Sequence, residues 1–292
     1  MSNTDARVLV AHSDHGSALV ADGSMVSFNF RKGGDRPLAG DRIELDDDHR
    51  LVSIHPRTTV FGRGDHAGRF RPTAANIDQL LIVVAPEPLP SLDLITRYLV
   101  MAELHQITPI VVVNKADLGV PQRPPFTDLE ALTKLGYTTL AVSAKSDENL
   151  APLQALTAGK VSLLAGQSGV GKSSILNALI PDTEILTGQL SNATGKGKHT
   201  TTTTRFYPLP YGGFLVDSPG VWEYGLWAIP TEELAHAFRD FRPFLGQCRF
   251  RDCTHDHEPH CAVIKALKDG MIDESRHEAW RRLLREQARY SK

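Results

Sequence analysis

The sequence predicts a multidomain fold, in which a small N-terminal β-barrel, a central α/β domain and a mostly helical C-terminal region follow one another. Residues 7–56 contain five short apolar or alternating runs separated by turn signals, which is typical of a small barrel. Strand-like and helix-like patterns then alternate from about residue 80 to 180, as in a parallel sheet covered by helices. All three cysteines lie close together near the C-terminus. We therefore expect three parts, residues 1–70, 71–228 and 229–292.

The composition is that of a globular protein. Of the 292 residues, 41% are hydrophobic and 23% are charged, as is usual for globular proteins. The formal net charge is −2, so any surface that binds nucleic acid must be a local patch. We find neither a signal-peptide pattern nor an apolar run of about 20 residues, and we expect a cytoplasmic protein with no membrane contact. An odd number of cysteines in one segment indicates metal ligands or reactive thiols.

The N-terminal part should form a five-stranded barrel. Its apolar runs are 8–10, 18–20, 25–30, 42–45 and 51–54. The oligonucleotide-binding (OB) fold is a barrel of this size, and a small β-domain that only packs on its neighbour fits the pattern equally well. The aromatic and basic side chains that would suit RNA are Phe28, Phe30, Arg31, Lys32 and Arg36. We expect residues 57–71, rich in glycine and arginine, to be a linker or mobile loop whose basic groups could contact phosphate.

The central part should contain a parallel sheet, because several of its apolar runs are continuous, as in strands buried on both faces. The expected strands are 80–85, 110–113, 138–142, 161–165 and 215–217. The expected helices are 92–102 with Ser91 as its cap, 127–134, 148–156 and one that starts at Lys172. In such a sheet, ligands bind beyond the carboxyl ends of the strands.

The stretch after the strand 161–165 has the G-x-x-x-x-G-K-S spacing of a phosphate loop and leads into a helical pattern. Its glycines let backbone N–H groups face a polyphosphate, Lys172 neutralises the outer phosphates, and the Ser173 hydroxyl binds magnesium. The N-terminal end of the helix adds positive potential. The predicted loop residues are Gly166, Gln167, Ser168, Gly169, Val170, Gly171, Lys172, Ser173 and Ser174.

Two short motifs at strand ends predict that the bound base is guanine. The Asp117 carboxylate can accept hydrogen bonds from the ring N–H and the exocyclic amine of guanine, and adenine offers no such adjacent donors. Asn114 would hold the loop and contact the purine, and the stem of Lys115 would lie along its ring. A backbone N–H of Ser143-Ala144-Lys145 would bind the guanine carbonyl oxygen. Each motif alone is often only a polar turn, but together, beside a phosphate loop, they favour guanine.

Two segments after the phosphate loop would sense the terminal phosphate. Asp217 and Gly220, in a D-x-x-G pattern, suit a contact to magnesium and a backbone N–H to the phosphate. The stretch 195–204 contains glycine, lysine, histidine and threonine but no apolar residue to bury. We expect it to be a switch that becomes ordered when a threonine hydroxyl, assigned to Thr201, contacts magnesium and phosphate. A threonine-rich strand over 202–206 remains an alternative for its second half.

The C-terminal part supplies three thiols and nearby imidazoles, enough for a closed tetrahedral zinc site of structural type. The candidate ligands are Cys248, Cys253, His255 and Cys261, with His257 and His260 as alternative imidazoles. Buried cysteines beside surface histidines are the competing interpretation, but the segment is too polar to form a core unaided. Thr231 should cap one helix. A last helix is expected over 273–290, with five arginines largely outside its apolar face: Arg276, Arg281, Arg282, Arg285 and Arg289.

The motif order is a circular permutation of the usual GTPase order, because both base motifs precede the phosphate loop and D-x-x-G follows it. With the loop 166–174, the threonine segment 195–204, the run Asp217-Ser218-Pro219-Gly220-Val221 and the cysteine segment, the chain resembles the RsgA (YjeQ) family of ribosome small subunit-dependent GTPases over about residues 7–290. The resemblance implies GTP hydrolysis to GDP with Mg²⁺, stimulated by the small ribosomal subunit late in its maturation. It also implies one structural Zn²⁺ with His255 as a ligand, and an OB barrel and a zinc domain that both contact ribosomal RNA.

The resemblance also bears on catalysis. Many GTPases place a glutamine directly after D-x-x-G to orient the attacking water, and here that position is Val221. His199 is the candidate replacement, a role that the family resemblance implies, and contact of His199 with RNA phosphate is the competing interpretation. Lys172 and Mg²⁺, the latter held in part by Thr201, would stabilise the charge of the transition state. Hydrolysis should be slow until the ribosome orders the switch.

Two other functions fit the sequence. A GTP-binding, RNA-binding placeholder without significant catalysis is supported by Val221, and phosphate release with and without small subunits would separate it from a GTPase. A permuted GTPase of large-subunit assembly shares the motif order, and cosedimentation with isolated subunits would decide that case. In each case we expect a monomer.

Overall fold

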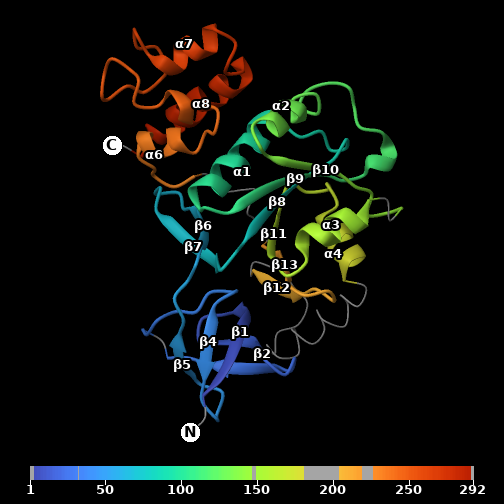
Figure 1. Cartoon of the computed structure of the whole chain (residues 1–292). Coiled ribbons are helices and arrows are strands. Elements are labelled where there is room, and N and C mark those ends of the chain that lie inside the picture. Colours follow the sequence, from blue (N-terminus) through green and yellow to red (C-terminus); the bar gives the residue numbers. More distant parts are fainter. Residues whose placement is uncertain (1–2, 32, 147–148, 181–203, 219–225, 291–292) are drawn as a thin grey trace.

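The computed structural model describes residues 3–31, 33–146, 149–180, 204–218 and 226–290. It contains a β-barrel at one end, an α/β domain in the centre and a helical region at the other end (Figure 1). This confirms the predicted multidomain architecture. No helix within the described ranges is long and apolar enough to cross a membrane.

The barrel is built from five antiparallel strands in the order β3-β2-β1-β4-β5. Its strands are β1 (Thr4–Ala11), β2 (His15–Val20), β3 (Met25–Asn29), β4 (Arg42–Leu45) and β5 (Leu51–Ile54). A bridge between Asn29 and Arg50 joins the two edges of this order, so the sheet curls toward closure. Val8, Phe28 and Ile43 are fully buried inside it. The five predicted strands are confirmed.

The stretch after the barrel is a β-hairpin, so the prediction of a linker or mobile loop over 57–71 is wrong. The hairpin consists of β6 (Val60–Gly64) and β7 (Phe70–Ala75). Its glycines permit close packing: a Cβ on Gly64 would lie 2.6 Å from the Leu226 carbonyl oxygen. Its arginines are partly neutralised, because Asp65 pairs with both Arg69 and Arg71. The hairpin thereby supports the distant segment that enters the C-terminal region, where the Ala228 N–H donates to the Gly68 carbonyl oxygen at 2.7 Å.

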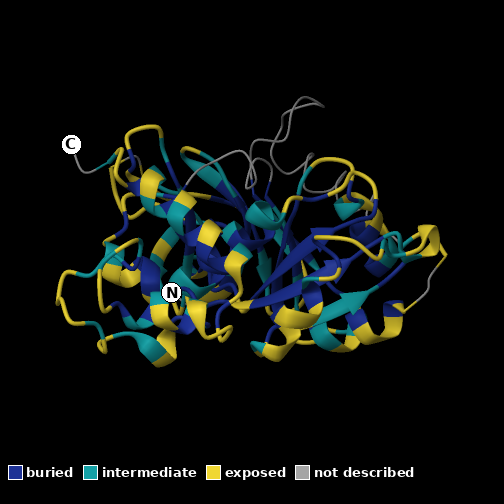
Figure 2. Cartoon of the chain, turned by 90° about the horizontal axis from the view of Figure 1, so that it is seen from above, coloured by how far each residue is buried: buried dark blue, intermediate teal, exposed yellow. Residues whose placement is uncertain are grey.

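The central sheet has the strand order β10-β9-β8-β11-β13-β12, with five parallel strands and β12 antiparallel at one edge. Its strands are β8 (Gln79–Val84), β9 (Thr108–Val113), β10 (Thr138–Ala141), β11 (Val161–Ala165), β12 (Arg205–Pro208) and β13 (Phe214–Asp217). Buried residues concentrate in this sheet, and exposed residues lie on the outer parts of the molecule (Figure 2). The predicted parallel sheet is confirmed. Thr202 and Thr203, of the alternative strand prediction, lie outside the described residues.

Within the part of the chain that the structure describes, four helices cover the sheet: α1 (Leu92–Leu104), α2 (Leu129–Lys134), α3 (Leu150–Thr157) and α4 (Lys172–Leu179). Ser91 caps α1 as predicted, because its hydroxyl accepts from the Leu94 N–H at 3.1 Å. The chain moves outward from β8 through α1 and α2, and then returns through α3 to β11 on the other side of β8. With right-handed crossovers, the strand order therefore reverses between β8 and β11. A ligand site is expected beyond the carboxyl ends of these two strands.

The C-terminal region contains α6 (Thr231–His236), α7 (Ala262–Lys268) and α8 (Glu274–Gln287). Thr231 does not cap α6 as expected: Pro230 occupies the cap position and Thr231 is the first helical residue. The last helix is confirmed, with Asp273 as its cap. Arg276, expected outside the apolar face, is instead buried with Asp240 in an ion pair of 2.9 Å. The charge is tolerated in the interior because it is paired and bonded there.

Candidate nucleotide and metal sites

The predicted phosphate loop lies between the end of β11 and the start of α4, at the point where the strand order reverses. Two of its glycines have positive φ and no space for a side chain. A Cβ on Gly166 (φ 145°) would lie 2.2 Å from the Val83 carbonyl oxygen, and one on Gly171 (φ 93°) would lie 2.3 Å from Asn114 Nδ2. Glycine is therefore required where the loop approaches the neighbouring strand and the base loop.

Lys172 folds back over this loop. Its Nζ donates to the carbonyl oxygens of Gly166 at 2.7 Å and Gln167 at 3.0 Å, so the ammonium is held inside the curve of the backbone. Burial lowers the pKa of Lys172, and the nearby carboxylate of Asp217 opposes that shift. Burial likewise raises the pKa of Asp217, against the effect of Lys172. A cation that suits phosphate and a carboxylate that suits a metal ion therefore lie near each other at this loop.

Asn114 joins the base loop to the phosphate loop. Its Nδ2 donates to the Val170 carbonyl oxygen at 2.9 Å, and its Oδ1 accepts from the Ala144 N–H at 3.2 Å. The residue is 1% exposed, so this side chain is used in holding the three loops together. We expected Asn114 to hold the loop of the first base motif, and these two hydrogen bonds show how it does so.

The other members of the base motifs lie beside it. The Ser143 hydroxyl donates to Asp117 Oδ1 at 2.6 Å, which fixes the exposed Asp117 carboxylate in the short 3-10 helix η1 (Ala116–Leu118) that follows β9. Lys115 Nζ donates to the Gly169 carbonyl oxygen of the phosphate loop at 2.7 Å, and its backbone is left-handed, with φ 59°. The structure therefore brings together the two base motifs and the phosphate loop, which are far apart in the sequence.

Replacement of Asp117 by asparagine should change base preference. An amide keeps the size of the carboxylate but offers a donor where guanine requires acceptors, and the changed edge of xanthine suits that donor. We expect GTP preference to shift toward the xanthine nucleotide, measured as the ratio of the two dissociation constants. Asp128→Asn, at a carboxylate outside the base motifs, is the control. A variant that retains the wild-type preference for GTP would contradict the assignment.

The predicted magnesium ligands are described in part. Asp217 stands at the end of β13, and Ser173 is exposed in the first turn of α4, next to Ser174 of the phosphate loop. Thr201, His199, Gly220 and Val221 lie outside the described residues.

The sequence did not point to the loop after β8, which supports both motifs through its backbone. Lys115 Nζ donates to the Glu87 carbonyl oxygen at 2.7 Å, and Gln167 Nε2 donates to the Pro88 carbonyl oxygen at 2.9 Å. Pro88 also lies against Gly169. Backbone acceptors carry no sequence signature, and the only available signal was the proline-rich stretch 86–90 at a strand end.

Four side chains of the C-terminal region converge as a tetrahedral metal site requires. The ligand atoms of Cys248, Cys253, His255 and Cys261 all lie within 4.8 Å of one another. Cys248 Sγ lies 3.8 Å from Cys261 Sγ and 3.5 Å from His255 Nδ1, and Cys261 Sγ lies 3.4 Å from that nitrogen. Tetrahedral zinc with Zn–S of about 2.3 Å and Zn–N of about 2.0 Å would separate two sulfurs by about 3.8 Å and sulfur and nitrogen by about 3.5 Å. The residues therefore fit zinc.

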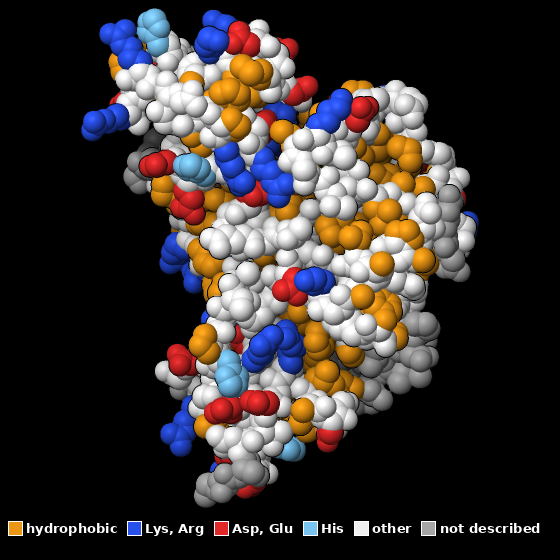
Figure 3. Space-filling view, in the orientation of Figure 1, with side chains coloured by type: hydrophobic (Ala, Val, Ile, Leu, Met, Phe, Trp, Pro, Cys, Tyr) orange, Lys and Arg blue, Asp and Glu red, His pale blue; other side chains and the backbone are white. Residues whose placement is uncertain are grey.

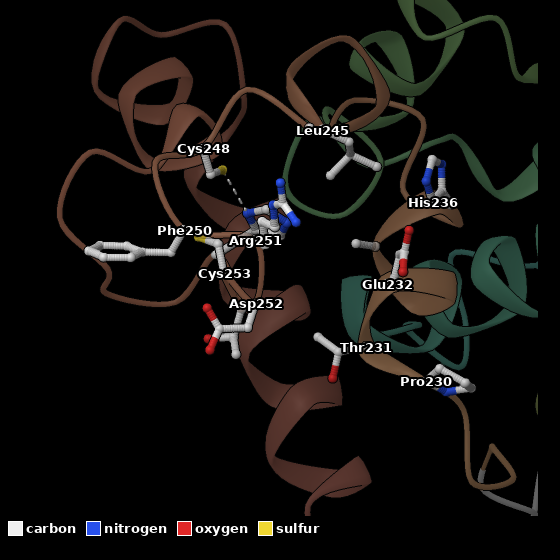
Figure 4. Close-up of a pocket in the computed structure, with 14 residues that line it drawn as sticks. Pro230, Thr231, Glu232, His236, Leu245, Cys248, Phe250, Arg251, Asp252 and Cys253 are labelled. Carbon is white, nitrogen blue, oxygen red and sulfur yellow. Dashed lines mark hydrogen bonds between the residues drawn. The ribbon is translucent and has the colours of Figure 1, made fainter.

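The chemistry of this cluster supports the same conclusion. Burial raises the pKa of the Cys253 and Cys261 thiols, so thiolates would form here only with a cation among them. His257 and His260, the alternative imidazoles, are both exposed and outside the cluster. In Figure 4, Cys248 and Cys253 lie across a cavity of about 580 Å³ from Glu232 and His236 of α6.

Helix α8 holds the loop that carries these ligands. His277 Nε2 and the His255 carbonyl oxygen are 2.8 Å apart, and the Trp280 indole N–H donates to the Thr254 carbonyl oxygen at 3.1 Å. Trp280 is fully buried against Phe241. The metal cluster and the last helix therefore form one packed unit.

Comparisons with known proteins agree with this geometry. A family model described as RsgA GTPase matches residues 54–227. The chain is 40% identical over 290 residues to the Small ribosomal subunit biogenesis GTPase RsgA of Histophilus somni (strain 2336), covering 96% of this chain and 83% of the relative. The protein of the same name from Alcanivorax borkumensis is 47% identical over 228 residues, covering 77% and 65% of the two chains.

Two solved structures have the same fold over almost their full lengths. YjeQ from Thermotoga maritima has a TM-score of 0.77 at 29% identity and covers 98% of this chain and 99% of its own. YloQ, described as a circularly permuted GTPase, has a TM-score of 0.76 at 28% identity, with coverage of 98% and 96%. The family model, the close relatives and the permuted order of the motifs agree, and this chain belongs to the RsgA family of GTP-hydrolysing enzymes.

Proposed function

We propose that this chain hydrolyses GTP in the biogenesis of the small ribosomal subunit, and that the subunit stimulates the hydrolysis. The observation that carries the proposal is the position of Asn114, which bonds to Val170 of the phosphate loop and to Ala144 of the base loop. One side chain thus assembles both halves of a guanine-nucleotide site. The names of the relatives from Histophilus somni and Alcanivorax borkumensis support small-subunit biogenesis over large-subunit assembly and over a placeholder without catalysis.

We assign a role to each group of the proposed site. The base is bound by Asn114, Lys115, Asp117, Ser143 and Ala144. The phosphates are bound by residues 166–174, with Gly220 at the terminal phosphate. Bound Mg²⁺, held by Ser173, Thr201 and Asp217, would offset phosphate charge. Lys172 stabilises the charge that develops on the phosphoryl oxygens.

A structural Zn²⁺ would be held by Cys248, Cys253, His255 and Cys261. Bound there, the ion would stabilise the C-terminal region, because the loop that carries these ligands has few apolar side chains with which to form a core.

His199 is the residue we assign to positioning the attacking water. His199→Ala should lower subunit-stimulated turnover by about a hundredfold, the usual contribution of a positioned acid or base, with GTP affinity nearly unchanged. The measurement is phosphate release at saturating subunits together with a nucleotide dissociation constant. His260→Ala, an exposed histidine outside the metal cluster, serves as the control. Unchanged turnover in His199→Ala would remove His199 from the mechanism and leave RNA contact as its role.

Ribosomal RNA is the proposed partner of the barrel and of the zinc-binding part. Lys and Arg side chains on the face in Figure 3 lie among Asp and Glu side chains at both ends of the molecule. RNA binding must therefore use local groups, as the net charge of −2 also requires. In this proposal the barrel domain comprises residues 1–70, the GTP-binding domain residues 71–228 and the zinc-binding domain residues 229–292. The protein acts as a monomer, with ribosomes, in the cytoplasm.

The test is phosphate release from GTP across a titration of isolated small subunits, with large subunits as the control. The proposal expects slow basal release and saturable stimulation by small subunits alone. Binding of GTP without stimulated release would instead support the placeholder, and stimulation by large subunits would support the other assembly pathway.

A further inference from the structure

Strands β12 and β13 form a ribbon that is closed at one end and open at the other. At the closed end a turn connects them, in which the Leu209 N–H donates to the Gly213 carbonyl oxygen at 3.0 Å. At the open end the last registered pair is Arg205 opposite Asp217. The chain beyond this pair leads to the threonine segment on one side and to the D-x-x-G motif on the other. Asp217 is therefore the last residue of β13 that is paired with both neighbouring strands.

Two hydroxyl groups meet directly beyond this last pair. Thr204 Oγ1 and Ser218 Oγ are 2.7 Å apart, a normal distance for a hydroxyl–hydroxyl bond. The two residues are only 8% and 7% exposed, so little water can replace this bond if one partner is removed. Ser218 also lies one residue past the last registered pair of β13 with β11, which joins Leu164 to Asp217. The hydroxyl pair Thr204–Ser218 thus continues the ribbon where both backbone ladders end.

We propose that the hydroxyl pair Thr204–Ser218 positions Asp217 for magnesium, so that both residues are positioning residues of the GTPase site. The inference rests on the proposed GTP-hydrolysing function. The pair fixes Ser218, and through the adjacent peptide it fixes the direction of the Asp217 carboxylate.

The direction of the Asp217 carboxylate matters because other charged groups lie close to it. The carboxylate is half-buried and lies near two cations, Lys172 and Arg205. If the ribbon opens, the carboxylate can turn toward either cation and away from the metal position. Loss of the hydroxyl pair should therefore weaken the magnesium-dependent part of nucleotide binding and leave the magnesium-independent part unchanged.

The experiment measures dissociation of a fluorescent, non-hydrolysable GTP analogue from the full chain, in excess Mg²⁺ and in excess EDTA. The ratio of the two rates is the magnesium factor. Thr204→Val removes the hydroxyl at constant shape and should reduce this factor about five- to tenfold, the effect of one buried hydrogen bond. Thr204→Ser keeps the hydroxyl and should restore most of it.

Thr157→Val is the matched control, because Thr157 is also a buried threonine, and its hydroxyl donates to the Leu153 carbonyl oxygen at 2.9 Å, away from the nucleotide site. It should lower the melting temperature and leave the magnesium factor unchanged. The double variant Thr204→Val/Ser218→Ala should lose no more of the factor than Thr204→Val alone, since both changes break one bond.

Three outcomes would overturn the inference: an unchanged magnesium factor in Thr204→Val, an equal loss in Thr157→Val, or additive losses in the double variant. If the wild-type chain did not bind the GTP analogue, the inference and the proposed function would both fail. A normal magnesium factor in both wild type and Thr204→Val would overturn the inference alone.

Discussion

Lys172→Ala is expected to reduce GTP hydrolysis between about a hundredfold and about a thousandfold, the usual effect of removing one preorganised group from the developing charge. The ammonium already sits inside the phosphate loop, 2.7 Å from the Gly166 carbonyl oxygen, so it needs little rearrangement to meet a phosphate. Burial lowers the pKa of Lys172, and the Asp217 carboxylate opposes this shift by favouring the charged ammonium that binds phosphate. Single-turnover phosphate release at saturating GTP and small subunits measures the effect.

Two variants make this prediction specific. Lys160→Ala removes an exposed lysine just before β11 and should leave hydrolysis unchanged. Lys172→Arg keeps the charge but replaces a compact ammonium by a planar fork, which the narrow curve of the loop does not fit, and it should recover little activity. Hydrolysis by Lys172→Ala within tenfold of the wild type would show that this lysine does not stabilise the transition state.

The extent to which the fold was predictable depended on whether the signal was local. Strands β8, β9 and β11 are continuous apolar runs, and the five barrel strands are short runs separated by turn signals, so the sequence itself contains their pattern. The β6–β7 hairpin was missed because its glycines and arginines resemble a loop. What stabilises it is distant in sequence: Leu226 packs on Gly64, and Ala228 bonds to Gly68.

In the candidate site too, local motifs could be predicted and contacts between distant segments could not. Asn114, Asp117, Lys172 and the cysteines could be named because each belongs to a short motif with a chemical purpose. The contacts that connect these motifs could not be named, because their acceptors are backbone carbonyl oxygens, such as that of Val170. Burial of Arg276 escaped prediction for a related reason: its partner Asp240 is 36 residues away in the chain.

Cys261→Ser is expected to abolish zinc binding and unfold the loop that carries the ligands. Structural zinc contributes on the order of 10 kcal/mol in small zinc-binding peptides, and this loop has little other core. Cys261 also caps α7, where its Sγ accepts from the Ile264 N–H at 3.5 Å, so the loss extends into that helix. We expect metal analysis to fall from one zinc per chain to about one tenth or less. Amide exchange should become fast over residues 248–268.

If the zinc is structural, its loss should unfold the zinc loop without affecting nucleotide binding. Helix α8 bonds to the zinc loop through Trp280 and His277, so the fluorescence of the buried Trp280 should shift to the red when the loop unfolds. The phosphate and base loops come from residues 79–180, and affinity for a fluorescent GTP analogue should therefore change less than about threefold. His260→Ala should retain zinc, because that imidazole is exposed and outside the cluster. Zinc retained by Cys261→Ser, or lost by His260→Ala, would mean that a different set of ligands holds the metal.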